Sequence, residues 1–216
     1  MRKGSNTMMS KRMLVLACLG VTFWMAGCRV HVDKGANSEE KKVQVDTPFG
    51  GIHVNTGQTT AADVGLPAYP GAQLVTGDDN HKSADVRMGF GEWELRVQVA
   101  SYSTADDEDK VVAFYRNALS SYGGVIACRD GAPVGTDSKT PEGLTCSDHG
   151  HAHVNINDHG QNYGYQPEHG GLELKSGSER HQHIVAFEHP RPGQTRFALV
   201  ALDLPGSSGG NAGKSD

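Results

Sequence analysis

Residues 92–104 read Glu-Trp-Glu-Leu-Arg-Val-Gln-Val-Ala-Ser-Tyr-Ser-Thr, and this stretch decides the fold. From Trp93 to Val99 apolar residues occupy every second position, and charged or amide side chains occupy the positions between them. Such alternation is typical of an antiparallel strand with one face in the core and the other in water. We therefore predict a strand over Glu92–Tyr102, and we expect the run Ala84–Phe90 to pair with it through the turn between them.

A single amphipathic helix is expected directly after this strand. Ser103 or Thr104 can cap its N-terminus, and the acidic run 106–108 places negative charge where the helix dipole is positive. Glycines at 123 and 124 are expected to end the helix. The apolar residues that repeat at spacings of three and four are Val111, Phe114, Tyr115, Ala118, Leu119 and Tyr122. We expect this stripe to pack against the sheet.

Further strands are predicted after the helix. The runs with strand composition are Val125–Arg129, Leu144–Asn157, Leu172–Lys175, His181–Glu188 and Arg196–Leu204. The last run is apolar on both faces, which indicates a central strand. The order of elements predicts an α+β domain over residues 65–204, with a mostly antiparallel sheet and one main helix packed on it. A hairpin and a link over residues 43–64 precede this domain, and the Gly/Ser-rich tail 205–216 is expected to be disordered.

The N-terminal region has the composition of a secretory signal peptide. Two basic residues precede an apolar run that is shorter than the roughly 20 residues of a membrane-spanning helix, and Met-Ala-Gly-Cys28 closes the run. This tetrapeptide resembles the lipobox of bacterial lipoproteins, and the resemblance implies that residues 1–27 are removed and Cys28 is lipidated. Cys18 is the competing acceptor, but only five residues separate it from Arg12. A plain secretory signal or an uncleaved anchor is the alternative interpretation.

Residues 28–42 would then provide the lipidated cysteine and a polar tether. Tyr-Pro-Gly-Ala at 69–72, the strand pair and the acid-capped helix make residues 65–125 similar to uncharacterised bacterial envelope lipoproteins, a resemblance that implies no activity. In lipoproteins of this kind an Asp after the cysteine favours retention in the inner membrane. Arg29 stands there in this chain, which implies the periplasmic side of the outer membrane.

Charge and length limit the partners. Removal of residues 1–27 from the 216-residue chain leaves 189 residues, enough for one domain. The removed part holds four Lys and Arg residues and no acidic residue, so 16 basic and 25 acidic side chains remain, a net charge of −9. No basic cluster remains, so nucleic acid is not expected as a partner. We expect the membrane, through the lipid anchor, and an envelope protein as partners.

The two cysteines left in the mature chain predict a disulfide. Cys128 and Cys146 form an even pair, and an oxidising envelope compartment favours their oxidation. A thiolate metal site is the alternative, because Cys146 stands three residues before His149.

Histidines suggest a metal site in the last third of the chain. His149, His151 and His153 alternate, so on a strand they would share one face, and His181 and His183 form a second pair of this kind. Asp158 and His159 are further candidates. Imidazole ligands suit zinc, copper or nickel. The other interpretation is a polar strand face that uses histidine, which would become less negative on protonation near pH 6.5.

No catalytic motif is recognisable, so no residue is assigned a catalytic role and no cofactor is required. Gly-x-Ser-x-Gly occurs only as Gly206–Gly210 in the Gly/Ser-rich tail, without the following helix of a nucleophile elbow, and the sequence contains no His-Glu-x-x-His zinc motif or phosphate-binding glycine loop. The leading hypothesis is a membrane-anchored envelope lipoprotein that acts as a non-enzymatic binding or interaction module. The alternative is a His-rich metal-binding lipoprotein, and an enzyme comes third.

Overall fold

An antiparallel sheet of eleven strands forms most of the protein. The computed structural model describes residues 28–34, 41–75, 83–146, 156–158, 161–163, 171–189 and 191–205. Within these ranges one α-helix and one short 3₁₀ helix accompany the strands, and no helix is long and apolar enough to cross a membrane. The prediction of a mostly antiparallel sheet with one main helix is therefore confirmed.

The strands follow one another along the chain, and the helical region lies between β6 and β7. The strands are β1 (Arg29–Lys34), β2 (Lys41–Thr47), β3 (Gly50–Thr56), β4 (Gln73–Leu74), β5 (Ala84–Phe90), β6 (Trp93–Thr104), β7 (Ile126–Arg129), β8 (Ala132–Pro133), β9 (Ile156–Asp158), β10 (Gln161–Tyr163), β11 (Leu172–Gly177), β12 (His181–Phe187) and β13 (Thr195–Asp203). The helices are α2 (Glu108–Leu119) and the 3₁₀ helix η2 (Ser120–Tyr122).

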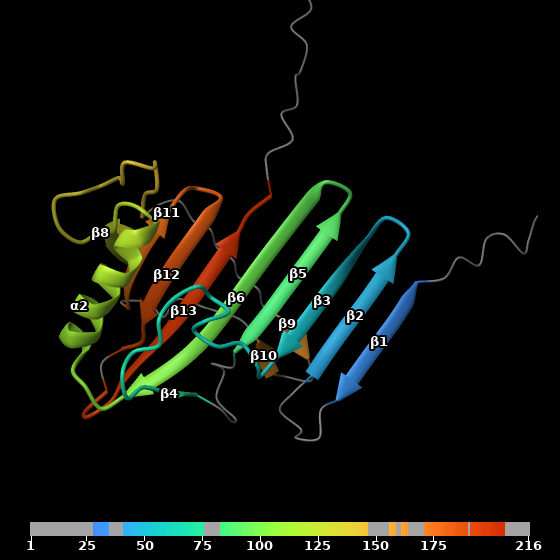
Figure 1. The fold of residues 1–216 in the computed structure, drawn as a ribbon, viewed down its shortest axis with the longest axis horizontal. Coiled ribbons are helices and arrows are strands. Elements are labelled where there is room, and N and C mark those ends of the chain that lie inside the picture. The colour runs from blue at the N-terminus through green and yellow to red at the C-terminus, as the bar shows by residue number, and fades with distance from the viewer. Residues whose placement is uncertain are drawn as a thin grey trace, which may run out of the picture.

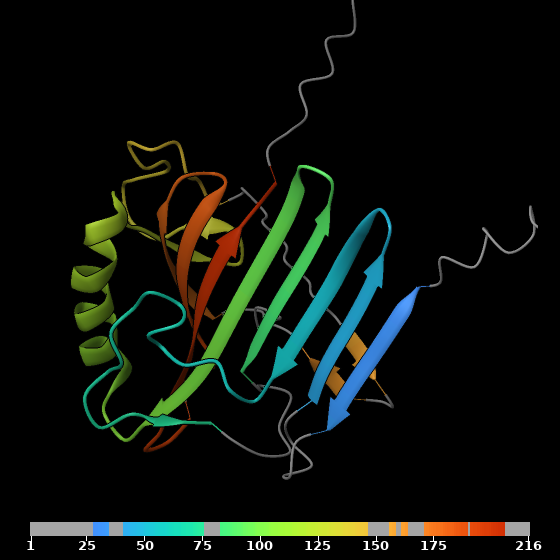
Figure 2. The same ribbon diagram turned by 45° about the vertical axis from the view of Figure 1, so that its right-hand side comes forward.

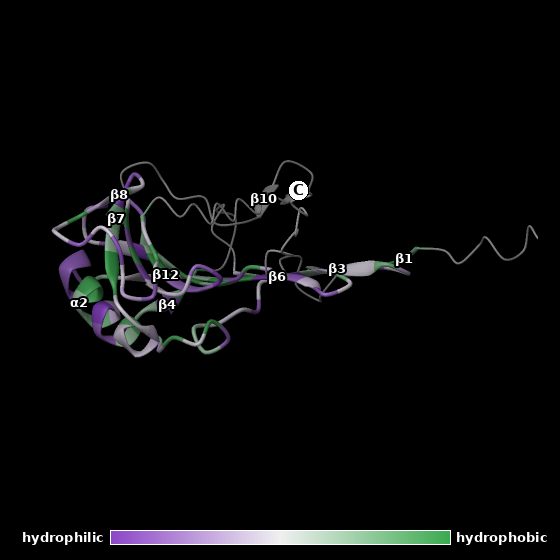
Figure 3. Ribbon diagram, turned by 90° about the horizontal axis from the view of Figure 1, so that it is seen from above, coloured by the Kyte–Doolittle hydropathy of each residue, from purple (hydrophilic) through white to green (hydrophobic). Residues whose placement is uncertain are grey.

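The sheet runs in the order β1-β2-β3-β5-β6-β13-β12-β11-β7-β8, with β4 added beside β6 (Figure 1). All of these pairings are antiparallel, and β9 pairs with β10 in a separate two-stranded sheet. Figure 2 shows that β1, β2 and β3 form one end of the sheet, away from α2. Seen edge-on in Figure 3, this end is a thin layer, whereas α2 packs at the opposite end. The sheet is therefore covered by the helix over only part of its width.

The predicted strand pair forms the middle of the sheet. β5 and β6 pair from Ala84 opposite Val99 to Phe90 opposite Trp93, as expected. The predicted central strand, β13, lies between β6 and β12. Burial does not alternate along β6. Every residue from Val97 to Tyr102 is buried, because Val97 and Val99 face one apolar cluster while Ala100 and Tyr102 face the other, on the helix side of the sheet.

Helix α2 covers one face of the sheet with the predicted stripe. Val111, Tyr115 and Leu119 are fully buried in one core cluster with residues of β6, β11, β12 and β13. The N-terminal cap prediction was wrong, because the N-cap is Asp107 and strand β6 continues to Thr104. Gly123 follows η2 with φ of 129°, so the glycine pair ends the helical region one 3₁₀ turn later than the α-helix itself.

The opposite face of the sheet carries a second apolar cluster. Its buried members are Ala84, Val86, Val97, Val99, Ile184, Val200 and Leu202. Both faces of the central strands are thus apolar, which explains why β13 lacks a polar face.

Three predicted boundaries differ from the structure. Arg29–Lys34 pairs along its whole length with β2, so this part of the predicted tether is the edge strand of the sheet. The hairpin of residues 43–64 is continuous with the domain, because β3 pairs with β5 and Val64 is part of the main core. Residues 144–146 form no strand, because hydrogen bonds between Leu144 and Thr140 close a loop there. The predicted disordered tail lies outside the described residues from 206 onward.

Candidate functional site

Cys28, the predicted lipidation site, stands at the start of the edge strand. It is exposed, it is the free cysteine of the described residues, and Arg29 directly after it is the first residue of β1. A group attached to Cys28 would therefore be joined to the sheet without an intervening linker. Register fixes its level in the sheet, since Arg29 pairs with Asp46 of β2.

Two turns share this end of the sheet with Cys28. The β2–β3 turn and the β5–β6 turn both lie at the end where β1 begins (Figures 1 and 2). One step beyond the level of Arg29, the paired residues across the strands are Thr47, Gly50, Phe90 and Trp93. Position 28 is likewise one step beyond Arg29, so Cys28 and Trp93 occupy the same level.

Aromatic side chains project from these turns. Phe49 is 84% exposed and Phe90 is 47% exposed, and the Phe90 ring lies 6.0 Å from the Trp93 ring between centroids. The sequence analysis did not identify these residues. A phenylalanine flanked by turn formers, as in Pro48-Phe49-Gly50 and Gly89-Phe90-Gly91, is the signal that could have identified them.

The sheet face on the helix side becomes polar beyond the helix. On β2, β3 and β5 it forms an open hollow of about 290 Å³, lined mainly by Lys42, Gln44, His53, Asn55, Asp85 and Arg87. The Asp85 carboxylate lies 3.1 Å from the Arg87 guanidinium and 3.7 Å from that of Arg96, and it accepts a hydrogen bond from Gln98. Charges of both signs thus lie side by side on this face.

The described histidines of the predicted metal site are each engaged by the domain. His181 and His183 lie two residues apart on β12, so they share one strand face as predicted. His181 Nδ1 lies 2.9 Å from Asp203 Oδ1 on the neighbouring strand. The His183 ring stacks on Tyr122, with 3.7 Å between ring centroids and an interplanar angle of 23°.

The other predicted metal ligands are not among the side chains that the structure describes. His149, His151, His153 and His159 lie outside the described residues, and the side chain of Asp158, the last residue of β9, is not described. Within the described part of the chain, no group of three or more His, Cys, Asp or Glu side chains could hold a metal ion. The zinc, copper or nickel site therefore stays a prediction.

The His183 side chain is closely packed against Tyr122 and Gly65. The Tyr122 hydroxyl donates a hydrogen bond to the Gly65 carbonyl, and a Cβ at Gly65 would lie 3.3 Å from His183 Nε2. Gly65 also has φ of +80°, a conformation that other residues rarely adopt. Burial lowers the pKa of His183, although the charge of Asp203 and a hydrogen bond to the Val64 backbone oppose this shift.

His183 is expected to make stability fall with acidification. Because its pKa is lower in the folded state, the unfolded state binds more protons as the pH drops below about 6.5, and folding stability is lost there. His183→Gln should flatten the dependence of the unfolding free energy on pH between about 6.5 and 5. Urea denaturation at several pH values measures this slope, and an equal slope in both proteins would contradict the prediction.

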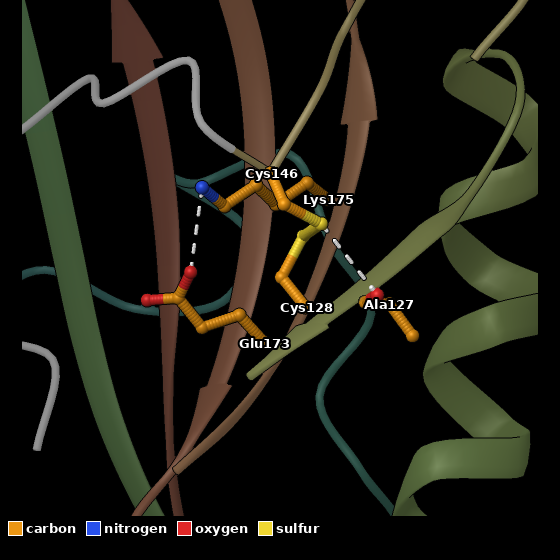
Figure 4. The surroundings of a disulfide bond; sticks show 5 residues. All are labelled: Ala127, Cys128, Cys146, Glu173 and Lys175. Carbon is orange, nitrogen blue, oxygen red and sulfur yellow. Dashed lines mark hydrogen bonds and ion pairs between the residues drawn. A yellow bond between two sulfur atoms is a disulfide. The ribbon is translucent and has the colours of Figure 1, made fainter. Parts of the chain in front are cut away.

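The predicted disulfide is confirmed. Cys128 and Cys146 are joined with an S–S distance of 2.04 Å, and both are buried beside Ile126. The bond ties the end of β7 to the loop before residue 147, next to the ion pair of β11 between buried Lys175 and half-buried Glu173 (Figure 4). Since both sulfurs are bonded, the alternative of a Cys146 thiolate ligand beside His149 is wrong for this structure.

Loss of the disulfide is expected to lower stability by about 3 kcal/mol, the value of the chain-entropy model for a loop of this size. The measurement is urea unfolding of a Cys128→Ala, Cys146→Ala double variant. Reductant should lower the melting temperature of the parent protein and leave that of the double variant unchanged. An equal response of both proteins to reductant would show that the bond does not stabilise the fold.

The chain matches no known family model, no curated protein and no solved structure.

Proposed function

We propose that the protein is a membrane-anchored lipoprotein of the bacterial cell envelope, held on the periplasmic side of the outer membrane by lipid on Cys28. The observation that carries the proposal is the position of Cys28, exposed and directly before the edge strand β1. Its exposure leaves the sulfur accessible to acylation, and the disulfide fits an oxidising compartment outside the cytoplasm.

The domain is proposed to act by binding, without covalent chemistry. Its binding surface is the mixed-charge hollow over β2, β3 and β5, which lies on the part of the sheet that α2 leaves uncovered. Paired charges such as Asp85 with Arg87 suit a polar protein partner, since charges of both signs set orientation and exclude wrong partners. Photo-crosslinking from position 44 or 53 in cells, compared with crosslinking from exposed Val134, tests for such a partner.

The anchor is tested by the mass of the mature protein. Extraction from cell membranes and mass spectrometry of the N-terminal peptide should find a chain that starts at Cys28 and carries acyl groups. Fractionation of inner and outer membranes then assigns the membrane. An unmodified N-terminus, or retention of residues 1–27, would overturn the proposal.

A further inference from the structure

Exposed apolar side chains concentrate in the edge strand β1 and at the two turns near Cys28. Of the five large hydrophobic side chains exposed in the described residues, Val30 and Val32 lie in β1, Phe49 and Phe90 lie at or beside the two neighbouring turns, and Val134 alone lies elsewhere. Scattered exposed apolar residues are normal on a protein surface, but a cluster calls for an explanation.

Alternation places the strand residues of this group, Val30, Val32 and Phe90, on one face. Val30 pairs with Val45, and the row continues through Ile52 and Met88 to Leu95, so these side chains share a sheet face. Trp93 is two residues before Leu95 and therefore points to this face as well. Position 28 is two residues before Val30, so continued alternation directs Cys28 to the same side.

Spacing keeps the whole group within reach of one membrane patch. Neighbouring strands lie about 4.8 Å apart, so the four steps from β1 to β6 span about 19 Å. Cys28 and Trp93 occupy the same level of the sheet, and Phe49 projects from the turn just beyond it. A lipid on Cys28 would hold both turns at the bilayer surface.

The turns are held firmly in this arrangement. Thr47 Oγ1 donates a hydrogen bond of 2.7 Å to the Gly50 carbonyl and accepts one of 3.1 Å from the Gly50 amide. A Cβ at Gly50 would lie 2.0 Å from the Gly89 carbonyl and 2.6 Å from the Phe90 ring, so only glycine permits the two turns to approach this closely. Phe49 and Phe90 are thus presented together, at little further loss of entropy on binding.

We propose that Phe49, Phe90 and Trp93 insert into the headgroup region of the bilayer that holds Cys28, so that this end of the sheet lies on the membrane. The inference rests on the proposed lipidation of Cys28. Aromatic rings favour the membrane interface, where Trp places its apolar ring beside lipid and its N–H near water. Arg29, Glu92 and Glu94 also lie at this end and carry both signs, so a zwitterionic surface is the partner that fits.

Trp93 provides a native probe of this contact. The chain has two tryptophans, and Trp24 leaves with the signal peptide, so Trp93 is the sole tryptophan of the mature protein. We suggest reconstituting the lipidated protein in phosphatidylcholine vesicles with and without brominated acyl chains. Quenching of Trp93 by bromine is expected in the parent protein.

Matched variants separate membrane contact from general effects. Phe49→Glu with Phe90→Glu should reduce quenching, since each ring transferred from the interface to water lowers the inserted population about tenfold. Phe49→Leu with Phe90→Leu should retain quenching, and Val134→Glu, an exposed change elsewhere, should leave it unaltered.

Each outcome decides the proposal. Lipid on Cys28 together with quenching that the Glu variants reduce supports it. Lipid on Cys28 without quenching overturns the membrane contact alone and leaves the anchor intact. A blue shift of Trp93 emission without quenching by brominated lipid would assign the patch to a second copy of the chain and overturn the contact. Absence of lipid on Cys28 overturns the proposed function and this inference together.

Discussion

Cys28→Ser should abolish the incorporation of labelled fatty acid into this protein. The thioether and amide positions that carry acyl chains in bacterial lipoproteins require the cysteine, and a hydroxyl does not replace its sulfur. Each buried CH₂ contributes about 0.8 kcal/mol, so loss of two or more chains converts effectively permanent attachment into weak binding. Acyl labelling in cells, followed by fractionation, measures both effects.

Cys18→Ser is the matched control for this experiment. Cys18 lies in the same apolar run as the competing acceptor, so its replacement should leave the label and the membrane fraction unchanged. Loss of label in the Cys18→Ser variant would show that Cys18 is needed for acylation. Retention of label in the Cys28→Ser variant would show that Cys28 is not the acceptor. The length of the Cys28→Ser product also shows whether the signal is still cut without lipid.

Local pattern was sufficient to predict the centre of the fold and insufficient for its edge. β6 and β13 are predictable because their own residues alternate between apolar and polar or form an unbroken apolar run. β1 was mistaken for a tether, although Val30 and Val32 alternate with polar residues, because charged residues dominate the segment. β1 is a strand because its backbone pairs with β2, and the composition of a segment does not reveal such pairing.

A candidate site could be predicted from the sequence where the chemistry of its own residues was sufficient to define it. The Cys128–Cys146 bond follows from two cysteines left in an even pair. The surroundings of His183 were not predictable, because its contacts with Tyr122 and Val64 come from residues 61 and 119 positions earlier in the chain. The same limit hid the aromatic end, since only the pairing of Gly50 with Phe90 brings the two turns together.

Phe197→Ala should destabilise the domain by about 3–5 kcal/mol. Phe197 is 1% exposed, and its ring contacts four other aromatic rings. They belong to Tyr69, Tyr102, Tyr115 and Phe187, with centroid distances of 6.5, 6.0, 5.4 and 6.1 Å. These rings come from β6, β12, helix α2 and the segment before β4, so a cavity at Phe197 would loosen the helix, the loop and the sheet at once. Urea unfolding measures the loss.

Two further variants show whether the effect belongs to this position. Phe197→Leu keeps most of the volume and should cost less than about 1.5 kcal/mol. Phe49→Ala removes the same ring from an exposed turn and should change stability by less than about 0.5 kcal/mol. Equal losses for Phe197→Ala and Phe49→Ala would mean that Phe197 is not a centre of the core. The expected difference would show that Phe197 holds α2 to the sheet, whereas Phe49 contributes little to stability and is free to bind elsewhere.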